Sequence, residues 1–248
     1  MARHPLNIDR ILRQWPYKAG EVNTRLVPAA GDREVIQMRI EMGLLQMEIE
    51  GRPDGQRPHG ADTYFDHLLQ ESFRLGDELT LSEDQCDEAD REFVQFYHRR
   101  ICWLSLREFH RAVRDADHTL AFMDFCRDHS PDEGWTQSHE QYRPFVLFHR
   151  VQAAALAALE DSGPEDAIHE LNDGLDQFRR LFEQYDAGDQ YEDDELVRRL
   201  VDLRESLRRD FEVGRTLDEQ LAEAIASEQY ELAAQIRDKI AARNSGQI

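Results

Sequence analysis

Lysine is nearly absent from this chain of 248 residues, because only Lys18 and Lys239 accompany a basic set that is otherwise arginine. No glycine-rich loop ends in Gly-Lys-Ser or Gly-Lys-Thr, the pattern that holds nucleotide phosphates against a lysine. The sequence also lacks a His-Glu-x-x-His pattern and the turn that presents a serine nucleophile. We therefore expect no ATP-driven step, no catalytic residue, no metal site and no cofactor, and the leading hypothesis is a non-enzymatic protein.

Cysteines and long apolar runs are also scarce. The three cysteines, Cys86, Cys102 and Cys126, are odd in number and form no Cys-x-x-Cys pair, which favours reduced thiols. The most apolar helix-sized stretch, Phe145 to Leu159, contains charged and polar residues and falls short of the roughly 20 apolar residues of a membrane span. The first residues contain no apolar run typical of a secretory signal. We expect a cytoplasmic protein that does not contact membranes.

Negative charge dominates the composition. The 51 acidic against 30 basic residues give a formal net charge of -21, and residues 61–210 hold most of the acidic excess. Such a surface repels phosphate backbones, so direct nucleic-acid binding is not expected. A hydrophobic fraction of 40% with only 8 prolines and 13 glycines favours a folded, helix-rich protein.

The first 60 residues predict a small α+β region. A short helix is expected over 8–14, followed by a β-hairpin whose strands, 22–27 and 35–42, alternate apolar and polar residues. Residues 44–49 are compatible with a third strand or a helix. The turn-rich loop 51–60 carries two arginines that could hold a carboxylate or phosphate, although a solvated connection is the simpler interpretation. These candidate ligand-loop residues are Arg52 and Arg57.

Beyond Asp62 the apolar residues recur at helical spacing. Ser82 with Gln85 is a capping box, and helices are expected up to a break near 105–108, then beyond it, and again over 145–160, 164–185 and 196–211. The interval 127–144 is expected to be a loop because it contains Pro131, Gly134 and many polar residues. Short turns between helices indicate an all-α body.

Part of this body, most closely Tyr97 to Leu120, resembles a tetratricopeptide-like helical hairpin. The second helices of two pairs align on the small residues Ala112 and Ala167, which would allow close helix packing. Because these alanines are separated by more than one period of about 34 residues, an insertion is expected within 123–144. An unrelated helical bundle remains the alternative.

The C-terminal segment predicts two short antiparallel helices. Thr216 with Glu219 forms a capping box, a polar turn follows at 227–229, and Tyr230 is expected to fill the space at that turn. Helices shorter than about 12 to 15 residues are marginal alone, so the hairpin needs a partner surface. The residues expected to bind protein are Leu217, Leu221, Ile225, Tyr230, Ala233, Ala234 and Arg237.

This hairpin resembles the UVR motif, found in the repair proteins UvrB and UvrC and in chaperone and adaptor proteins of the Clp protease system. Gln229 and Leu232 stand where that family usually has more polar or charged residues. The resemblance implies a docking hairpin that pairs with another such hairpin or with itself, and implies no helicase or nuclease activity. The matching positions are Leu217, Leu221, Tyr230, Glu231, Ala233, Ala234, Arg237 and Asp238.

The predicted fold is mainly α, with a small N-terminal β-sheet, a tetratricopeptide-like body and a UVR-type hairpin. The leading function is an interaction or adaptor protein. The alternatives are an accessory factor of nucleotide excision repair that acts through UvrB or UvrC, an adaptor of a Clp-type protease and, less favoured, a small-molecule sensor that uses the loop 51–60. The expected domains are an α+β region 1–60, a helical body 61–190, a connecting helix 191–212 and the hairpin 213–243.

Overall fold

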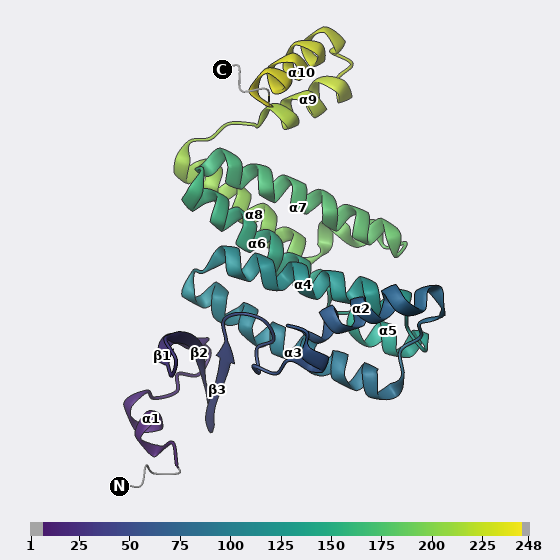
Figure 1. Cartoon of the computed structure of the whole chain (residues 1–248). Helices are drawn as coiled ribbons and strands as arrows, with labels where there is room; N and C mark the ends of the chain where they lie inside the picture. The colour runs from purple at the N-terminus through teal and green to yellow at the C-terminus, as the bar shows by residue number, and fades with distance from the viewer. Residues whose placement is uncertain (1–6, 245–248) are drawn as a thin grey trace. The chain divides into compact units, whose positions relative to one another are not determined.

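The computed structural model describes residues 7–244, in which helices predominate and a small sheet lies near the N-terminus (Figure 1). The chain divides into two compact units, Met1–Ala153 and Ala154–Ile248. The mainly helical class, the N-terminal sheet and the C-terminal helical hairpin are confirmed. A tetratricopeptide arrangement of the body stays a prediction.

The N-terminal sheet has three antiparallel strands in the order β1-β2-β3. The turn between its first two strands uses left-handed backbone at Gly31 and Asp32, which glycine adopts easily and aspartate tolerates. Buried Ile36 pairs with Met47, so residues 44–49, left open between strand and helix, include the third strand. The strands and the preceding helix are α1 (Asp9–Gln14), β1 (Asn23–Ala29), β2 (Arg33–Ile40) and β3 (Gly43–Glu48).

A buried carboxylate holds the start of the first body helix, α2 (Tyr64–Leu75). Thr63 caps this helix, and Glu92, which is fully buried, accepts hydrogen bonds from the backbone N–H groups of Tyr64 at 2.6 Å and Phe65 at 3.1 Å. A negative charge at a helix N-terminus satisfies free N–H groups and meets the positive end of the helix dipole. Two short 3-10 turns flank α2, η1 (Pro58–Gly60) and η2 (Gly76–Glu78).

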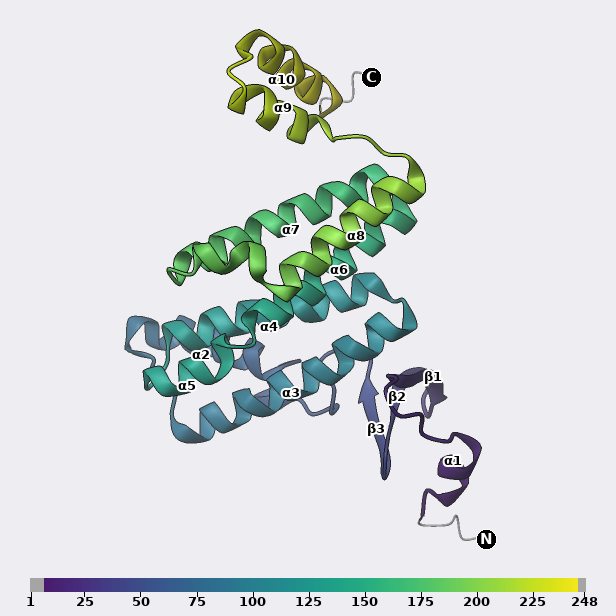
Figure 2. The ribbon, with the colours of Figure 1, turned by 180° about the vertical axis from the view of Figure 1, so that it is seen from behind.

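Two long antiparallel helices form the centre of the first unit, and both views show them side by side (Figures 1 and 2). The capping box at Ser82 is confirmed, and Arg107 in left-handed conformation ends the first helix where a break is predicted. Buried residues from three helices share one core, including Leu68, Ala89 and Phe122. The pair consists of α3 (Glu83–Leu106) and α4 (Phe109–Asp128).

The predicted loop over 127–144 is wrong in its middle, because α5 (Glu133–Glu140) lies there. Asp132 caps this helix by accepting a hydrogen bond from the backbone N–H of Trp135 at 2.9 Å. The Trp135 indole donates to Asp90 on α3 at 3.2 Å. This tertiary contact stabilises a polar segment whose own composition is typical of a loop.

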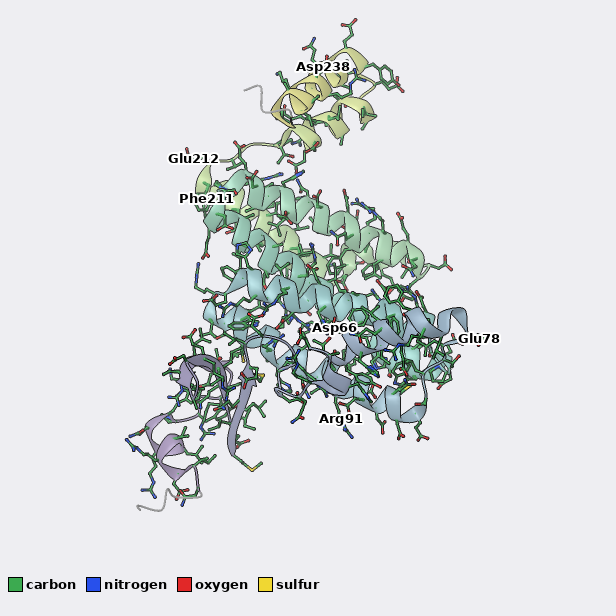
Figure 3. All side chains as sticks on the ribbon, in the orientation of Figure 1. Asp66, Glu78, Arg91, Phe211, Glu212 and Asp238 are labelled. Carbon is green, nitrogen blue, oxygen red and sulfur yellow. The ribbon has the colours of Figure 1, made fainter. Side chains whose placement is uncertain are left out.

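The second unit contains the end of α6 and the helices that follow it. The acidic run near 190–195 supplies a helix cap, since Asp194 accepts from the backbone N–H groups of Leu196 at 2.9 Å and Val197 at 3.0 Å. Figure 3 labels Phe211 and Glu212, where the last long helix ends in a left-handed residue. The elements are α6 (Arg143–Asp161), α7 (Pro164–Gln184), η3 (Gly188–Asp193), α8 (Glu195–Phe211), α9 (Leu217–Ala226) and α10 (Tyr230–Asn244).

Membrane-spanning segments were sought among residues 7–244. None of the helices there combines the length and the apolar character that crossing a bilayer requires.

Candidate functional site

Local hydrogen bonds fix the start of the C-terminal hairpin and the turn between its two helices. The Thr216 hydroxyl accepts from the Glu219 backbone N–H at 3.3 Å, and the Glu219 carboxylate accepts from the Thr216 N–H at 2.8 Å, which confirms the capping box. Glu228 adopts left-handed backbone at the turn, and the N–H of Gln229 donates to the carbonyl of Ala224 at 2.8 Å. These bonds satisfy both ends of α9 and reverse the chain into α10.

A small apolar core joins the two helices. Its buried residues are Ala224, Ala233 and Ile236, and the alanines leave room for the two backbones to approach closely. Three larger side chains, Leu217, Leu221 and Ile240, pack partly buried around them. Of the predicted binding residues, Leu217, Leu221 and Ala233 therefore stabilise the hairpin itself.

Other predicted binding residues lie on the outside of the hairpin. Tyr230 does not fill the space at the turn, because its side chain is 68% exposed, and Ile225 is 53% exposed. Arg237 is exposed and pairs at 3.4 Å with neighbouring Asp238, which Figure 3 labels on α10. Ala234 is half-buried. These side chains are available to a partner.

Helix geometry places the exposed residues on one side of the hairpin. Ile225 follows buried Ala224 by one position, and Ala234 follows buried Ala233 by one position. Because a single step turns both right-handed helices by about 100° and the helices are antiparallel, both steps lead to the same side. Tyr230 and Arg237 lie in the row of Ala234 at helical spacings of four and three. We call Ile225, Tyr230, Ala234 and Arg237 the Tyr230 face.

An ion pair connects the hairpin to the preceding helix within the second unit. Arg208 on α8 pairs with Glu219 on α9. Burial alone raises the pKa of Glu219, but the hydrogen bonds from Arg208 and from the Thr216 backbone outweigh burial and lower the pKa below its ordinary value. Sequence reasoning identified Glu219 only as a cap, because a pairing with a residue on another helix leaves no local pattern.

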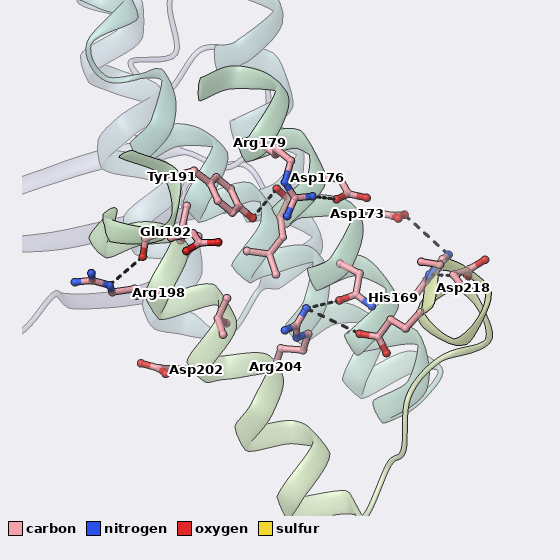
Figure 4. A pocket seen from close by; sticks show the side chains of 16 residues that line it. His169, Asp173, Asp176, Arg179, Tyr191, Glu192, Arg198, Asp202, Arg204 and Asp218 are labelled. Carbon is pink, nitrogen blue, oxygen red and sulfur yellow. Dashed lines mark hydrogen bonds and ion pairs between the residues drawn. The ribbon is translucent and has the colours of Figure 1, made fainter. Parts of the chain in front are cut away.

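A polar cavity of about 770 Å³ lies beside this connection (Figure 4). Its charged groups largely bond one another: Arg179 donates to Asp176 at 2.8 Å and Arg204 donates to Asn172 at 2.8 Å. The Tyr191 hydroxyl, whose pKa is raised by burial, donates to a backbone carbonyl of α7 at 3.2 Å. The polar side chains of this lining therefore connect α7, α8 and α9 to one another.

The second candidate site, the loop 51–60, holds its two arginines in different states. Arg52 is buried, and its guanidinium contacts Glu88 at 2.5 Å and Glu92 at 3.7 Å. Arg57 is exposed and pairs with Asp62 at 2.5 Å. Both line a hollow of about 550 Å³. Arg52 therefore anchors the loop to α3, and Arg57 is the more accessible of the two.

No cluster of three or more metal-ligating side chains occurs among residues 7–244. The stacked pair His59 and His67, with ring centroids 4.0 Å apart, borders the same hollow as the two arginines. Burial and the neighbouring His59 lower the pKa of His67.

Comparison with known proteins identifies one segment of the chain. Residues 214–242 match the family model of the UvrB/uvrC motif, which confirms the resemblance seen in the sequence. No curated protein and no solved structure matches the chain. The matched residues begin just before α9 and end within α10, so the hairpin with its small alanine core and exposed Tyr230 face carries the UVR motif.

Proposed function

We propose that this protein is a non-enzymatic interaction protein that docks a protein partner through the Tyr230 face of its C-terminal hairpin. The observation that carries the proposal is the exposure of Ile225 and Tyr230 on a hairpin that carries a UVR motif. UVR motifs suggest protein–protein or repair-related interaction, so a protein partner is consistent with the match.

The energetics of the hairpin support this role. Its helices have 10 and 15 residues, and its core has only three buried side chains, so it gains little apolar burial of its own. Tyrosine and isoleucine on a rigid helix present apolar area at low entropic cost, and tyrosine and arginine are enriched at binding hot spots. Covering the Tyr230 face would therefore both stabilise the hairpin and supply binding energy.

The finer alternatives differ in the partner. An accessory factor of nucleotide excision repair would dock on UvrB or UvrC and reach DNA only through them, whereas an adaptor of a Clp-type protease would dock on a component of that system. The net charge of -21 disfavours direct contact with nucleic acid in either case. A sensor that uses Arg52 has weaker support, since its guanidinium already contacts Glu88 and Glu92.

The test is affinity purification of the full chain followed by mass spectrometry. The double variant Ile225→Ala with Tyr230→Ala removes the exposed apolar side chains and leaves the buried core of the hairpin intact. Leu232→Ala is the matched control, because Leu232 is 44% exposed on the same helix but lies on the opposite side from Tyr230. Leu221 is left unchanged, since it packs in the core.

The double variant is expected to lose a partner that the unaltered protein and Leu232→Ala both retain. Equal recovery of every partner by the double variant would refute docking through this face. A DNA-binding assay at low salt separates the alternatives further: negligible binding by the protein alone is expected, and tight binding would contradict the argument from charge. Loss of degradation of a client after removal of this protein would favour the protease adaptor.

A further inference from the structure

Two consecutive arginines of α3 are both buried but are paired very differently. Arg99 donates from Nε and Nη2 to the two carboxylate oxygens of Asp115, each at 2.8 Å, and from Nη1 to the carbonyls of Glu48 and Gly51. Arg100 is only 1% exposed, and no carboxylate of residues 7–244 lies within ion-pair distance of it. Arg99 therefore has a direct carboxylate partner, whereas the charge of Asp115 acts on Arg100 only from beyond ion-pair distance.

Neither of the side chains that contact the Arg100 guanidinium is a carboxylate. Its Nη1 donates to the hydroxyl of Thr119 at 3.0 Å, and its Nε lies 3.4 Å from Nδ1 of His149. Burial lowers the pKa of Arg100 to about 10. A buried charge without a counter-ion is costly, so a negatively charged group is the ligand chemistry that this guanidinium favours.

Arg100 lies in the wall of an apolar groove of about 700 Å³ in the first unit. The lining comes from α3, α4, α5 and the start of α6, and most of it is aromatic or aliphatic. A second polar atom, Nδ1 of His139, is buried there without a hydrogen-bond partner among the described residues. The apolar lining includes Phe93, Val94, Tyr97, Met123, Phe145 and Val146.

We propose that this groove binds a small amphiphilic carboxylate, with its aliphatic chain along the apolar lining and its carboxylate on Arg100. Arginine is the side chain best suited to bind a carboxylate, because its N–H groups match the two oxygens. A volume of about 700 Å³ is that of a small-molecule site, since such sites span about 300–1,000 Å³. An apolar lining with one buried cation selects for a long chain that ends in a single anionic group.

Two acidic groups near the groove are candidates to neutralise Arg100. Asp90 in the lining contacts His139 at 2.6 Å and the indole of Trp135, and Glu140 outside the lining contacts Arg143 at 2.5 Å. These carboxylates therefore have local partners, and within the described range 7–244 neither forms an ion pair with Arg100.

The experiment uses the full chain and isothermal titration calorimetry with three probes: decanoate, decanol and acetate. Decanol keeps the chain without the charge, and acetate keeps the charge without the chain. Decanoate is expected to bind saturably at one site, and decanol at least about tenfold more weakly, which corresponds to one charge-assisted hydrogen bond. Acetate is expected to show no saturation in the same range.

Arg100→Met keeps most of the apolar stem and removes the guanidinium. It is expected to bind decanoate and decanol equally, a change that a merely structural role of Arg100 would not produce. Tyr142→Glu adds a negative charge at an exposed position of the lining and is expected to weaken decanoate more than decanol. Tyr17→Glu adds the same charge at an exposed tyrosine outside the groove and should leave both affinities unchanged.

Three results would overturn the proposal: no saturable decanoate binding, equal affinity of the unaltered protein for decanoate and decanol, or an undiminished preference for decanoate in Arg100→Met. If circular dichroism shows that Arg100→Met is unfolded, Tyr142→Glu decides. An unchanged decanoate affinity in that variant then rejects the site.

Discussion

The buried pair of Arg99 and Asp115 yields the sharpest prediction about stability. Their side chains are 2% and 1% exposed, and both carboxylate oxygens accept from the guanidinium at 2.8 Å. Asp115→Asn keeps the shape but removes the negative charge, which leaves two adjacent buried guanidinium groups without a counter-ion. Breaking one partner of a buried pair costs about 3–5 kcal/mol. The first unit should lose stability by that amount.

Tryptophan fluorescence in urea measures this loss in the right unit, because Trp15, Trp103 and Trp135 all lie within residues 1–153. With a denaturant slope of about 2 kcal/mol/M, the midpoint should fall by about 2 M. Asp117→Asn is the control one half-turn along α4: Asp117 is 51% exposed and pairs with Arg150 at 2.8 Å, so its loss should cost about 1 kcal/mol or less. Equal midpoints for the two variants would refute the reasoning.

Further predictions concern the thiols and the hairpin. Burial raises the pKa of Cys86 and Cys102 to about 11 and raises the pKa of Cys126 as well, so the three thiols should react with dithiobis(nitrobenzoate) slowly near neutral pH in the folded protein and rapidly in urea. Thr216→Ala removes the capping box and should cost about 1 kcal/mol, seen as faster hydrogen exchange in α9 alone. The folded pKa of Glu219 lies below its unfolded value, so its stabilisation is present above the unfolded pKa and is lost as pH falls through the folded one. Exchange protection of α9 should therefore decline on acidification below 4.5, the ordinary pKa of a glutamate, and Glu219→Gln should remove that dependence.

Features set by neighbours in sequence were predictable. The two capping boxes, at Ser82 and Thr216, each join residues three positions apart, so the sequence contains both partners. The alternation of apolar residues predicted the β-hairpin, and the capping box with the polar turn at 227–229 predicted the antiparallel helix pair at the C-terminus. In these cases local propensity and tertiary packing agree.

Features set by distant partners were not predictable. Arg52 was a candidate ligand residue in a turn-rich loop, but its side chain is buried and forms ion pairs with Glu88 and Glu92 on α3. Residues 133–140 read as a loop, since the contact of Trp135 with Asp90 that supports α5 crosses 45 positions. No pattern within either segment reveals such a partner.

The last prediction concerns the different partners of the two consecutive arginines. The residue at position 119 of α4 determines the partner that α4 offers to Arg100. Asp115 and Thr119 are one helical turn apart, and each bonds one of the two guanidinium groups of α3. Arg99 contacts the carboxylate of Asp115, whereas Arg100 contacts the hydroxyl of Thr119 on the same helix. Thr119→Asp should therefore give Arg100 an internal counter-ion and abolish the preference of the groove for decanoate over decanol.

Thr119→Val is the control for this exchange, because it removes the hydroxyl without adding charge. It should retain decanoate binding, since Arg100 then has one acceptor fewer and a ligand carboxylate remains its strongest available partner. The measurement is the ratio of decanoate to decanol affinity in the three proteins. If Thr119→Asp folds and keeps the ratio of the unaltered protein, the charge of Arg100 does not determine what the groove binds.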